Sequence, residues 1–450
     1  MSGQVEGGNE MTVSQSMGGI HAAGPFTESQ LNQLFSRITR RIIPILTMMF
    51  VVAFIDRVNV GFAKLQMLSD LNFTNETYGL GAGIFFIGYA LFQIPCNLYL
   101  YRFGARKVLA GITVLWGFVS IVNLFVKTPI EFYSIRFLLG VAEAGFSPGI
   151  ILYLSGWYPS SLRASMIGLI FLGQPAAFIV GGPISGYIMR TFVGVGGLAN
   201  WQWLFLLEGL PAVILGACMY IFVTDGPDSA AWLSGAEKKV IEAALEDDRR
   251  KNPPVHSSFV ASLSHPVLWQ FGAIYFCWVF GFSALQFWTP TMLAQAGISN
   301  FFYIGLITGA LNLVAALCMT LNSRHSDAVR ERRLHFSVAL VIGAIMFVAV
   351  SQLSAAPVLL MIALGITSGA MFAPAALFWE MPIASLSGTA IAGGLALINS
   401  IGVTAGFVSQ YAIGFVLTRT NSIALGLILT AAFTLLGAVL VVVLVPRKVA

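Results

Sequence analysis

The feature that most constrains this chain is a series of twelve long apolar stretches that follow one another with few polar interruptions. Their approximate limits are 42–62, 78–99, 107–127, 130–156, 165–190, 202–224, 267–290, 302–322, 335–354, 356–381, 389–416 and 423–445. A helix that crosses a bilayer needs about 20 mostly apolar residues. Charged residues make up only 10% of the chain, whereas soluble proteins carry about 25%. The sequence therefore predicts an all-α membrane protein with twelve transmembrane helices.

The polar segments divide these stretches into two sets of six. The longest segment follows the sixth stretch and contains AEKKVIEAALEDDRRKNPP. We expect a disordered N-terminus over residues 1–30, an N-terminal half over 31–224, a central loop over 225–265 and a C-terminal half over 266–450. Thr27 and Gln30 have the spacing of a capping box. They predict a short surface helix before the first span, whose arginines at positions 37, 40 and 41 meet lipid headgroups.

The distribution of positive charge predicts the orientation. With the N-terminus in the cytoplasm, 18 of the 24 Lys and Arg residues fall on the cytoplasmic side. Lys64, Lys127, Arg190 and Arg419 then fall outside. Because cytoplasmic loops carry an excess of Lys and Arg, both termini are predicted to be cytoplasmic.

Four charged residues stand out inside predicted spans, where each costs at least ~2.5 kcal/mol to insert. They are Asp56 and Arg57 in the first stretch, and Arg136 and Glu143 in the fourth. Arg136 and Glu143 are about two helical turns apart and share one face, whereas the consecutive Asp56 and Arg57 point about 100° apart. We expect all four to share one water-accessible cavity, where an arginine binds a carboxylate ligand and a buried acid carries a proton. The alternative is a set of inert ion pairs, which are weak stabilisers.

Several uncharged side chains are weaker candidates for the same cavity. Tyr89, Gln174 and Asn399 could hydrogen-bond a ligand or another helix, and Trp379 could form a wall. Gln174 and Asn399 suit the hydroxyls of tartrate or a sugar acid, whereas the aromatic residues Phe287, Trp288 and Phe378 suit an aromatic acid. Glu208 is expected to anchor the sixth span near the outer interface, and Glu380 to be exposed near the cytoplasm.

Four segments together carry a family resemblance. FIDRVNVGFA begins at Phe54, RFLLGVAEAGFSPG spans 136–149, WQWLFLLEGLPAVILG spans 201–216, and LFWEMP and LINSIG lie within 377–402. With these segments the chain resembles the anion:cation symporter group of the major facilitator superfamily, over about residues 35 to 445. The bacterial tartrate, phthalate, 4-hydroxyphenylacetate and sugar-acid permeases are the members that it resembles most.

The resemblance implies two six-helix halves, alternating access and proton-coupled uptake of organic anions across a bacterial inner membrane. It implies that Asp56 and Glu143 are the protonatable acids, and that Arg57 and Arg136 face the substrate. The positions that line the substrate cavity in this group match Tyr89, Gln174, Trp379 and Asn399. In the cytoplasmic signature loop the matching residues are Arg102, Gly104, Arg106 and Lys107, with Asp327 in the second half. This chain has Asn97 and Tyr101 where the signature usually has Gly and Asp, which puts the gating charge pair of the first half in doubt.

The sequence favours a symporter that moves a small organic carboxylate with one or more protons. It implies no cofactor other than the coupling proton, no nucleic-acid partner and a functional monomer. Proton-independent anion exchange and a non-transporting anion sensor are the alternatives. An enzyme is not expected, because the chain has no P-loop, H-E-x-x-H or G-x-S-x-G motif.

Overall fold

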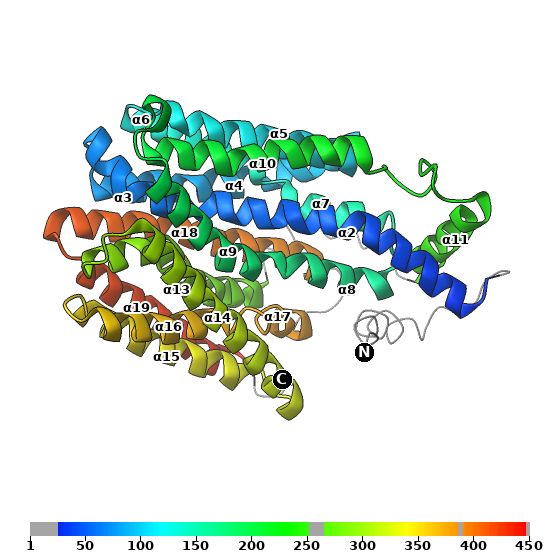
Figure 1. Cartoon of the computed structure of the whole chain (residues 1–450). Coiled ribbons are helices and arrows are strands. Elements are labelled where there is room, and N and C mark those ends of the chain that lie inside the picture. The colour runs from blue at the N-terminus through cyan, green and yellow to red at the C-terminus, as the bar shows by residue number, and fades with distance from the viewer. Residues whose placement is uncertain (1–25, 252–264, 386–389, 447–450) are drawn as a thin grey trace, which may run out of the picture.

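The computed structural model describes residues 26–251, 265–385 and 390–446, and within them every regular element is a helix. The helices pack lengthwise as two bundles (Figure 1). The N-terminal half contains α2 (Glu28–Val58), α3 (Val60–Leu71), α4 (Asn75–Phe103), α5 (Ala105–Val122), α6 (Pro129–Glu143), α7 (Phe146–Ser155), α8 (Ser160–Phe171), α9 (Gly173–Thr191) and α10 (Asn200–Phe222), with the short 3-10 turns Asn123–Phe125 and Val195–Gly197. The C-terminal half contains α13 (Pro266–Gln295), α14 (Phe301–Val329), α15 (Arg333–Gln352), α16 (Pro357–Phe372), α17 (Glu380–Ser385), α18 (Ala390–Thr420) and α19 (Ile423–Leu444).

The predicted spans correspond to these helices, with one departure in length. Within the described residues, eleven helical segments are long and apolar enough to cross a membrane, and α16 is a shorter apolar helix of 16 residues. The tenth predicted stretch continues past α16, but its helix ends at Phe372. Pro374 explains this break, because proline has no backbone N–H and clashes with the preceding turn. The chain turns between Phe372 and α17 instead of continuing as one helix.

The start of the first helix differs from the sequence prediction. The Thr27–Gln30 capping box is present, but no separate surface helix follows it. Instead, α2 continues from Glu28 to Val58, because Leu34, Phe35 and Ile38 are buried against the bundle. The arginines at positions 37 and 41 contact protein, since Arg37 forms an ion pair with Glu237 and Arg41 lies over the Trp232 ring.

The two ends of the bundle are distinct. Helix α11 (Gly235–Lys251) lies at one end, the right of Figure 1, and we call this the α11 end. The opposite end carries α3 and the start of α6, and we call it the Lys64 end after a buried lysine of α3. Residues 1–25 of the predicted N-terminal segment (1–30) and residues 252–264 of the predicted central loop (225–265) lie outside the described residues.

The two halves meet through close helix contacts near the Lys64 end. Helix α4 packs on α18, and α9 packs on α14. Glycines permit this approach: a Cβ on Gly79 would lie 2.4 Å from the carbonyl oxygen of Gln410, and a Cβ on Gly305 would lie 2.2 Å from that of Gly182. Small residues let helix backbones approach in this way inside membranes. The structure therefore closes the interface between the halves at the Lys64 end.

Candidate functional site

The four charged residues predicted inside the spans lie together in the N-terminal half. Arg57 forms the one direct ion pair among them: its Nη2 lies 2.6 Å and its Nε 3.3 Å from Oε2 of Glu143. The Glu143 side chain is 1% exposed and that of Arg57 is 19% exposed. Arg57 therefore reaches the edge of the cluster, and Glu143 lies inside it. The sequence predicts that these charges share a water-accessible cavity. In the structure Asp56, Arg136 and Glu143 are almost completely buried, and only Arg57 is partly exposed.

Asp56 has partners of its own and does not pair with its neighbour in sequence. Its Oδ1 accepts hydrogen bonds from the Ser120 hydroxyl and, at 3.2 Å, from Nδ2 of Asn59. Its Oδ2 is buried without a hydrogen-bond partner. The 100° angle between consecutive helical residues accounts for this arrangement, since it turns Asp56 into the N-terminal half and leaves Arg57 at its edge.

Arg136 is the most unusual of the four. Its side chain is fully buried, and none of its three guanidinium nitrogens has a hydrogen-bond partner. It lies 5.2 Å from the centre of the Phe85 ring, and it interacts electrostatically with Asp56 and Glu143. A buried cation without a hydrogen bond is costly. The nearby carboxyl groups therefore supply the charge compensation that Arg136 needs.

Aromatic rings surround the exposed edge of the cluster. The Arg57 guanidinium lies 4.8 Å from the Phe54 ring and 5.2 Å from the Tyr89 ring. Tyr89 in turn interacts with Tyr275 of the other half. The Tyr275 ring lies 4.6 Å from that of Phe378 and 5.1 Å from that of Trp379, measured between ring centres. Tyr275, a residue that the sequence did not single out, therefore packs on Trp379 and lies on the Tyr89 side of the site.

The two amide candidates occupy different places. Asn399 of α18 donates to Gln93 of α4 at 3.4 Å, so it bridges the halves. Gln174 lies at the start of α9, half-buried, and the described hydrogen bonds do not connect it to the charged cluster. Its neighbour Gly173 packs against α2 near Thr47, several residues before Arg57.

Several predicted site residues lie where a helix is interrupted. Arg57 is near the end of α2, Glu143 ends α6, Gln174 is next to the start of α9, and Trp379 lies just before α17. Pro148, Pro175 and Pro374 follow within a few residues of three of these breaks, and proline cannot supply the backbone N–H that a continuous helix requires. Broken helices are common at the binding sites of transporters.

Two charged residues lie elsewhere than predicted. Lys64, expected in an outer loop, is only 3% exposed within α3. Its Nζ donates to Thr291 at 3.1 Å and lies 3.7 Å from the centre of the Trp288 ring. Trp288 therefore packs in the closed interface between the halves. Glu208, expected near the outer interface, is 4% exposed and accepts a hydrogen bond from Ser185 at 2.7 Å.

Only the position of Glu208 could have been inferred from the sequence, because the start of α3 at Val60, which places Lys64 in a buried helix, is known from the structure alone. Glu208 lies eight residues into a helix that begins at Asn200, which corresponds to about 12 Å of depth. A depth estimate of this kind would have placed Glu208 with the buried charges.

Comparisons with known proteins agree with this arrangement. A model of the Major Facilitator Superfamily matches residues 45–406. The chain belongs to the major facilitator superfamily. Among its relatives, a putative metabolite transport protein of Pseudomonas putida, NicT, is 41% identical over 92% of this chain and 95% of its own length. A putative tartrate transporter of Agrobacterium vitis is 39% identical over 94% of this chain and 93% of its own length.

A solved structure supports the same fold. That of a D-xylose-proton symporter aligns with a TM-score of 0.70 at 15% identity, over 91% of this chain and 98% of that one. Membership of the superfamily and the transporters among its relatives make the chain a multi-pass membrane transporter of small organic molecules and not an enzyme. No cluster of three or more His, Cys, Asp or Glu side chains suited to a metal ion occurs in the described part of the chain.

The signature loop of the superfamily keeps a charge pair in this chain despite its missing Asp. Gly104 between α4 and α5 has a φ of 87°, which glycine adopts without strain. Arg106 pairs with Asp225, Nη1 to Oδ2 at 2.8 Å, and donates to the Tyr220 carbonyl at 2.6 Å. Arg102 lies over the neighbouring Phe103 ring. Lys107 has no ion pair in the described structure.

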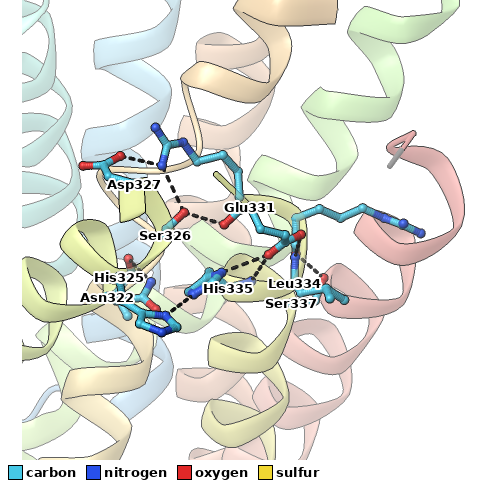
Figure 2. Close-up of polar contacts among 11 residues, drawn as sticks. Asn322, His325, Ser326, Asp327, Glu331, Leu334, His335 and Ser337 are labelled. Atoms are coloured by element: carbon cyan, nitrogen blue, oxygen red, sulfur yellow. Dashed lines mark hydrogen bonds and ion pairs between the residues drawn. The ribbon is translucent and has the colours of Figure 1, made fainter. Parts of the chain in front are cut away.

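The C-terminal half has a corresponding cluster of charged side chains at the junction of α14 and α15 (Figure 2). Arg332 forms ion pairs with Asp327 and with Glu380, each at 2.5 Å. Figure 2 shows Asp327 with its ion pair. Glu380 is exposed, as the sequence predicts. In the same view, Nδ1 of His325 lies 2.7 Å from Nε2 of His335. A cavity of about 600 Å³ lies beside these histidines between α14, α15 and α16, but no Lys or Arg lines it, so it does not suit a carboxylate substrate.

Proposed function

We propose that the protein is a proton-coupled symporter of a small organic carboxylate. The observation that carries this proposal is the Arg57–Glu143 ion pair, which joins a buried acid to an arginine at the accessible edge of the site. A substrate carboxylate can replace Glu143 on Arg57 only if Glu143 loses its charge, since two carboxylates would otherwise compete for one guanidinium. Binding of the anion and of a proton are thereby linked at a single arginine.

Arg136 has a different role in this proposal. It lies fully buried within electrostatic range of both acids, and its nitrogens are free of hydrogen bonds. With two acids and two arginines, the empty site is electrically balanced when both acids are ionised. Arg136 then stabilises the ionised acids of the empty carrier, and Arg57 exchanges Glu143 for the substrate.

The opposite wall of the site favours a substrate with a flat ring. Tyr275, Phe378 and Trp379 lie within 5.1 Å of one another, centre to centre, and Tyr275 reaches the Tyr89 side of the site. Stacking on such rings favours an aromatic acid, such as phthalate or 4-hydroxyphenylacetate. The amides of Gln93 and Asn399 suit a hydroxyl group on the same substrate. A tartrate-like acid is the competing substrate.

We further propose that the protein works as a monomer in a bacterial inner membrane with both termini in the cytoplasm. The excess of Lys and Arg on the termini side supports this orientation. The Lys64 end then faces outward, and the closed interface there corresponds to a state that opens inward.

Uptake by purified protein in liposomes tests the proposal. With radiolabelled 4-hydroxyphenylacetate and tartrate as probes, an inward proton gradient should drive accumulation of at least one of them. Arg57→Ala should abolish this uptake, whereas the exposed Arg190→Ala serves as the control and should keep it. Uptake that ignores the proton gradient would favour the anion exchanger, and substrate binding without any flux would favour a sensor. Full uptake by Arg57→Ala would refute the assignment of Arg57.

A further inference from the structure

A second group of polar side chains lies deeper in the N-terminal half, beside Asp56. Its centre is Glu208 of α10, which is 4% exposed. Oε1 of Glu208 accepts a hydrogen bond from the Ser185 hydroxyl of α9 at 2.7 Å, while Oε2 is buried without a partner. The side chain of Glu208 also interacts with those of Asn59 and Asp56. Glu208 has no role in the coupling of anion and proton at Arg57 described above.

Asn59 lies between the two acids. It is fully buried at the junction of α2 and α3. Its Nδ2 donates to Oδ1 of Asp56 at 3.2 Å, and its Oδ1 has no hydrogen-bond partner. The network thus contains three buried oxygens without partners: Oδ2 of Asp56, Oδ1 of Asn59 and Oε2 of Glu208. The last two belong to side chains that lie within hydrogen-bonding reach of each other.

An ionised Glu208 does not fit this arrangement. A carboxylate only accepts hydrogen bonds, so an ionised Glu208 could not supply the donor that the buried Oδ1 of Asn59 lacks. The charged group that faces Glu208 is the carboxyl of Asp56, which is of like sign. The arginine of this region, Arg136, interacts with Asp56 and Glu143, and the described structure contains no ion pair to Glu208. An ion buried without a counter-charge is strongly disfavoured.

We infer that Glu208 is a proton-binding site: its Oε2 carries a proton and donates it in a hydrogen bond to Oδ1 of Asn59. This single proton gives the partnerless oxygens of Asn59 and Glu208 a partner. It also fixes which end of the Asn59 amide faces Asp56, because with Oδ1 held by Glu208 the Nδ2 group must point to Asp56. Glu208 is therefore a positioning residue for Asp56.

The consequence for Asp56 follows from its hydrogen bonds. Ser120 and Asn59 both donate to its carboxylate, and donors to the charged form favour ionisation. Loss of the proton on Glu208 would free the Asn59 amide to turn. Asp56 would then keep its proton to higher pH, by about one pH unit for one lost hydrogen bond to a charged group. This second step rests on the proposed function and on the role as a protonatable acid that the family resemblance implies for Asp56.

Infrared difference spectroscopy on the purified full-length protein in nanodiscs tests the proton on Glu208 directly. Near neutral pH, the wild type should show a protonated-carboxyl C=O stretching band that is missing in Glu208→Gln. The band should persist in Asp56→Asn and in the control Glu131→Gln, whose side chain is exposed. An unchanged carboxylic-acid region in Glu208→Gln would overturn the inference. This result does not depend on whether the protein couples transport to protons.

The pH profile of uptake tests the positioning role. The amide of Gln can donate to Asn59 as a protonated carboxyl does, so Glu208→Gln should keep the wild-type midpoint. Glu208→Ala cannot donate, and its midpoint should move upward by about one pH unit. Equal shifts in the two variants would refute the positioning role. A pH profile that is unaffected by Asp56→Asn would instead count against the role of Asp56 as a coupling acid, and the infrared result would stand.

Discussion

The glycine contacts between α9 and α14 make a quantitative prediction about the closed interface. A Cβ on Gly305 would lie 2.2 Å from the Gly182 carbonyl oxygen, whereas ordinary contacts of this kind lie at 3.4–4 Å. Gly305→Ala therefore forces the two helix backbones apart, and such overpacking costs about 1–3 kcal/mol. A state that is open at the Lys64 end does not bear this cost. The substitution should therefore shift the equilibrium toward that state by about 5- to 150-fold.

Gly111 of α5 supplies the matched control. A Cβ at this position meets no atom within 4 Å. The replacement of glycine by alanine favours a helix by about 0.5–1 kcal/mol at either position, and this gain is common to both conformations. Gly111→Ala should consequently leave the conformational equilibrium unchanged.

Double electron–electron resonance measures this equilibrium. Spin labels at Ile130 of α6 and Tyr303 of α14, both exposed at the Lys64 end, would report the distance between the halves there. In nanodiscs, Gly305→Ala should gain a population at longer distance, and Gly111→Ala should match the unsubstituted protein. An unchanged distance distribution in Gly305→Ala would refute the claim that this interface opens and closes.

Three further predictions concern charges outside the central cluster. Asp225→Asn should lower the free energy of unfolding by no more than about 1 kcal/mol, measured by thermal denaturation, because its pair with Arg106 is partly exposed. Lys64→Met should not lower the midpoint of thermal unfolding, because it replaces a buried charge that has no carboxylate partner. Burial opposes ionisation of Glu237, but hydrogen bonds from the Ser234 backbone and the Arg37 guanidinium outweigh it and hold its pKa below the ordinary value. The attachment of α11 should thus be stable above about pH 4 and weaken below it, which hydrogen exchange of α11 measures.

Each of these predictions has a contradicting result. A loss of several kcal/mol in Asp225→Asn would mean that this pair holds the loop more tightly than its exposure implies. A clearly lowered midpoint in Lys64→Met would show that the contacts with Thr291 and Trp288 outweigh the cost of burying the charge. Unchanged exchange of α11 in acid would show that the Arg37–Glu237 pair does not hold it.

The membrane-spanning helices and the clustering of the four charged residues could be predicted from the sequence. Apolar length alone identified each membrane-length helix of the described residues, because lipid permits few alternatives to a helix. The cost of charge in a membrane placed Asp56, Arg57, Arg136 and Glu143 inside the protein, and the structure brings them together.

The sequence could not give the pairing of these charges or the position of the helix breaks. Which acid meets Arg57 depends on the rotation and tilt of α2 against α6, and both result from packing across the whole bundle. Tyr275 carries no charge and no motif, so its place between Tyr89 and Trp379 emerges only in three dimensions. Lys64 was missed because a lone lysine near a span end usually marks a loop.

The central claim is that Glu143 links a proton to substrate binding at Arg57, and one comparison in liposomes tests it most directly. Glu143→Gln cannot ionise, so it should lose accumulation of 4-hydroxyphenylacetate or tartrate under a proton gradient while it keeps exchange of the same probe between equal internal and external pools. The wild type should show both activities. Accumulation by Glu143→Gln at the wild-type level would contradict the account.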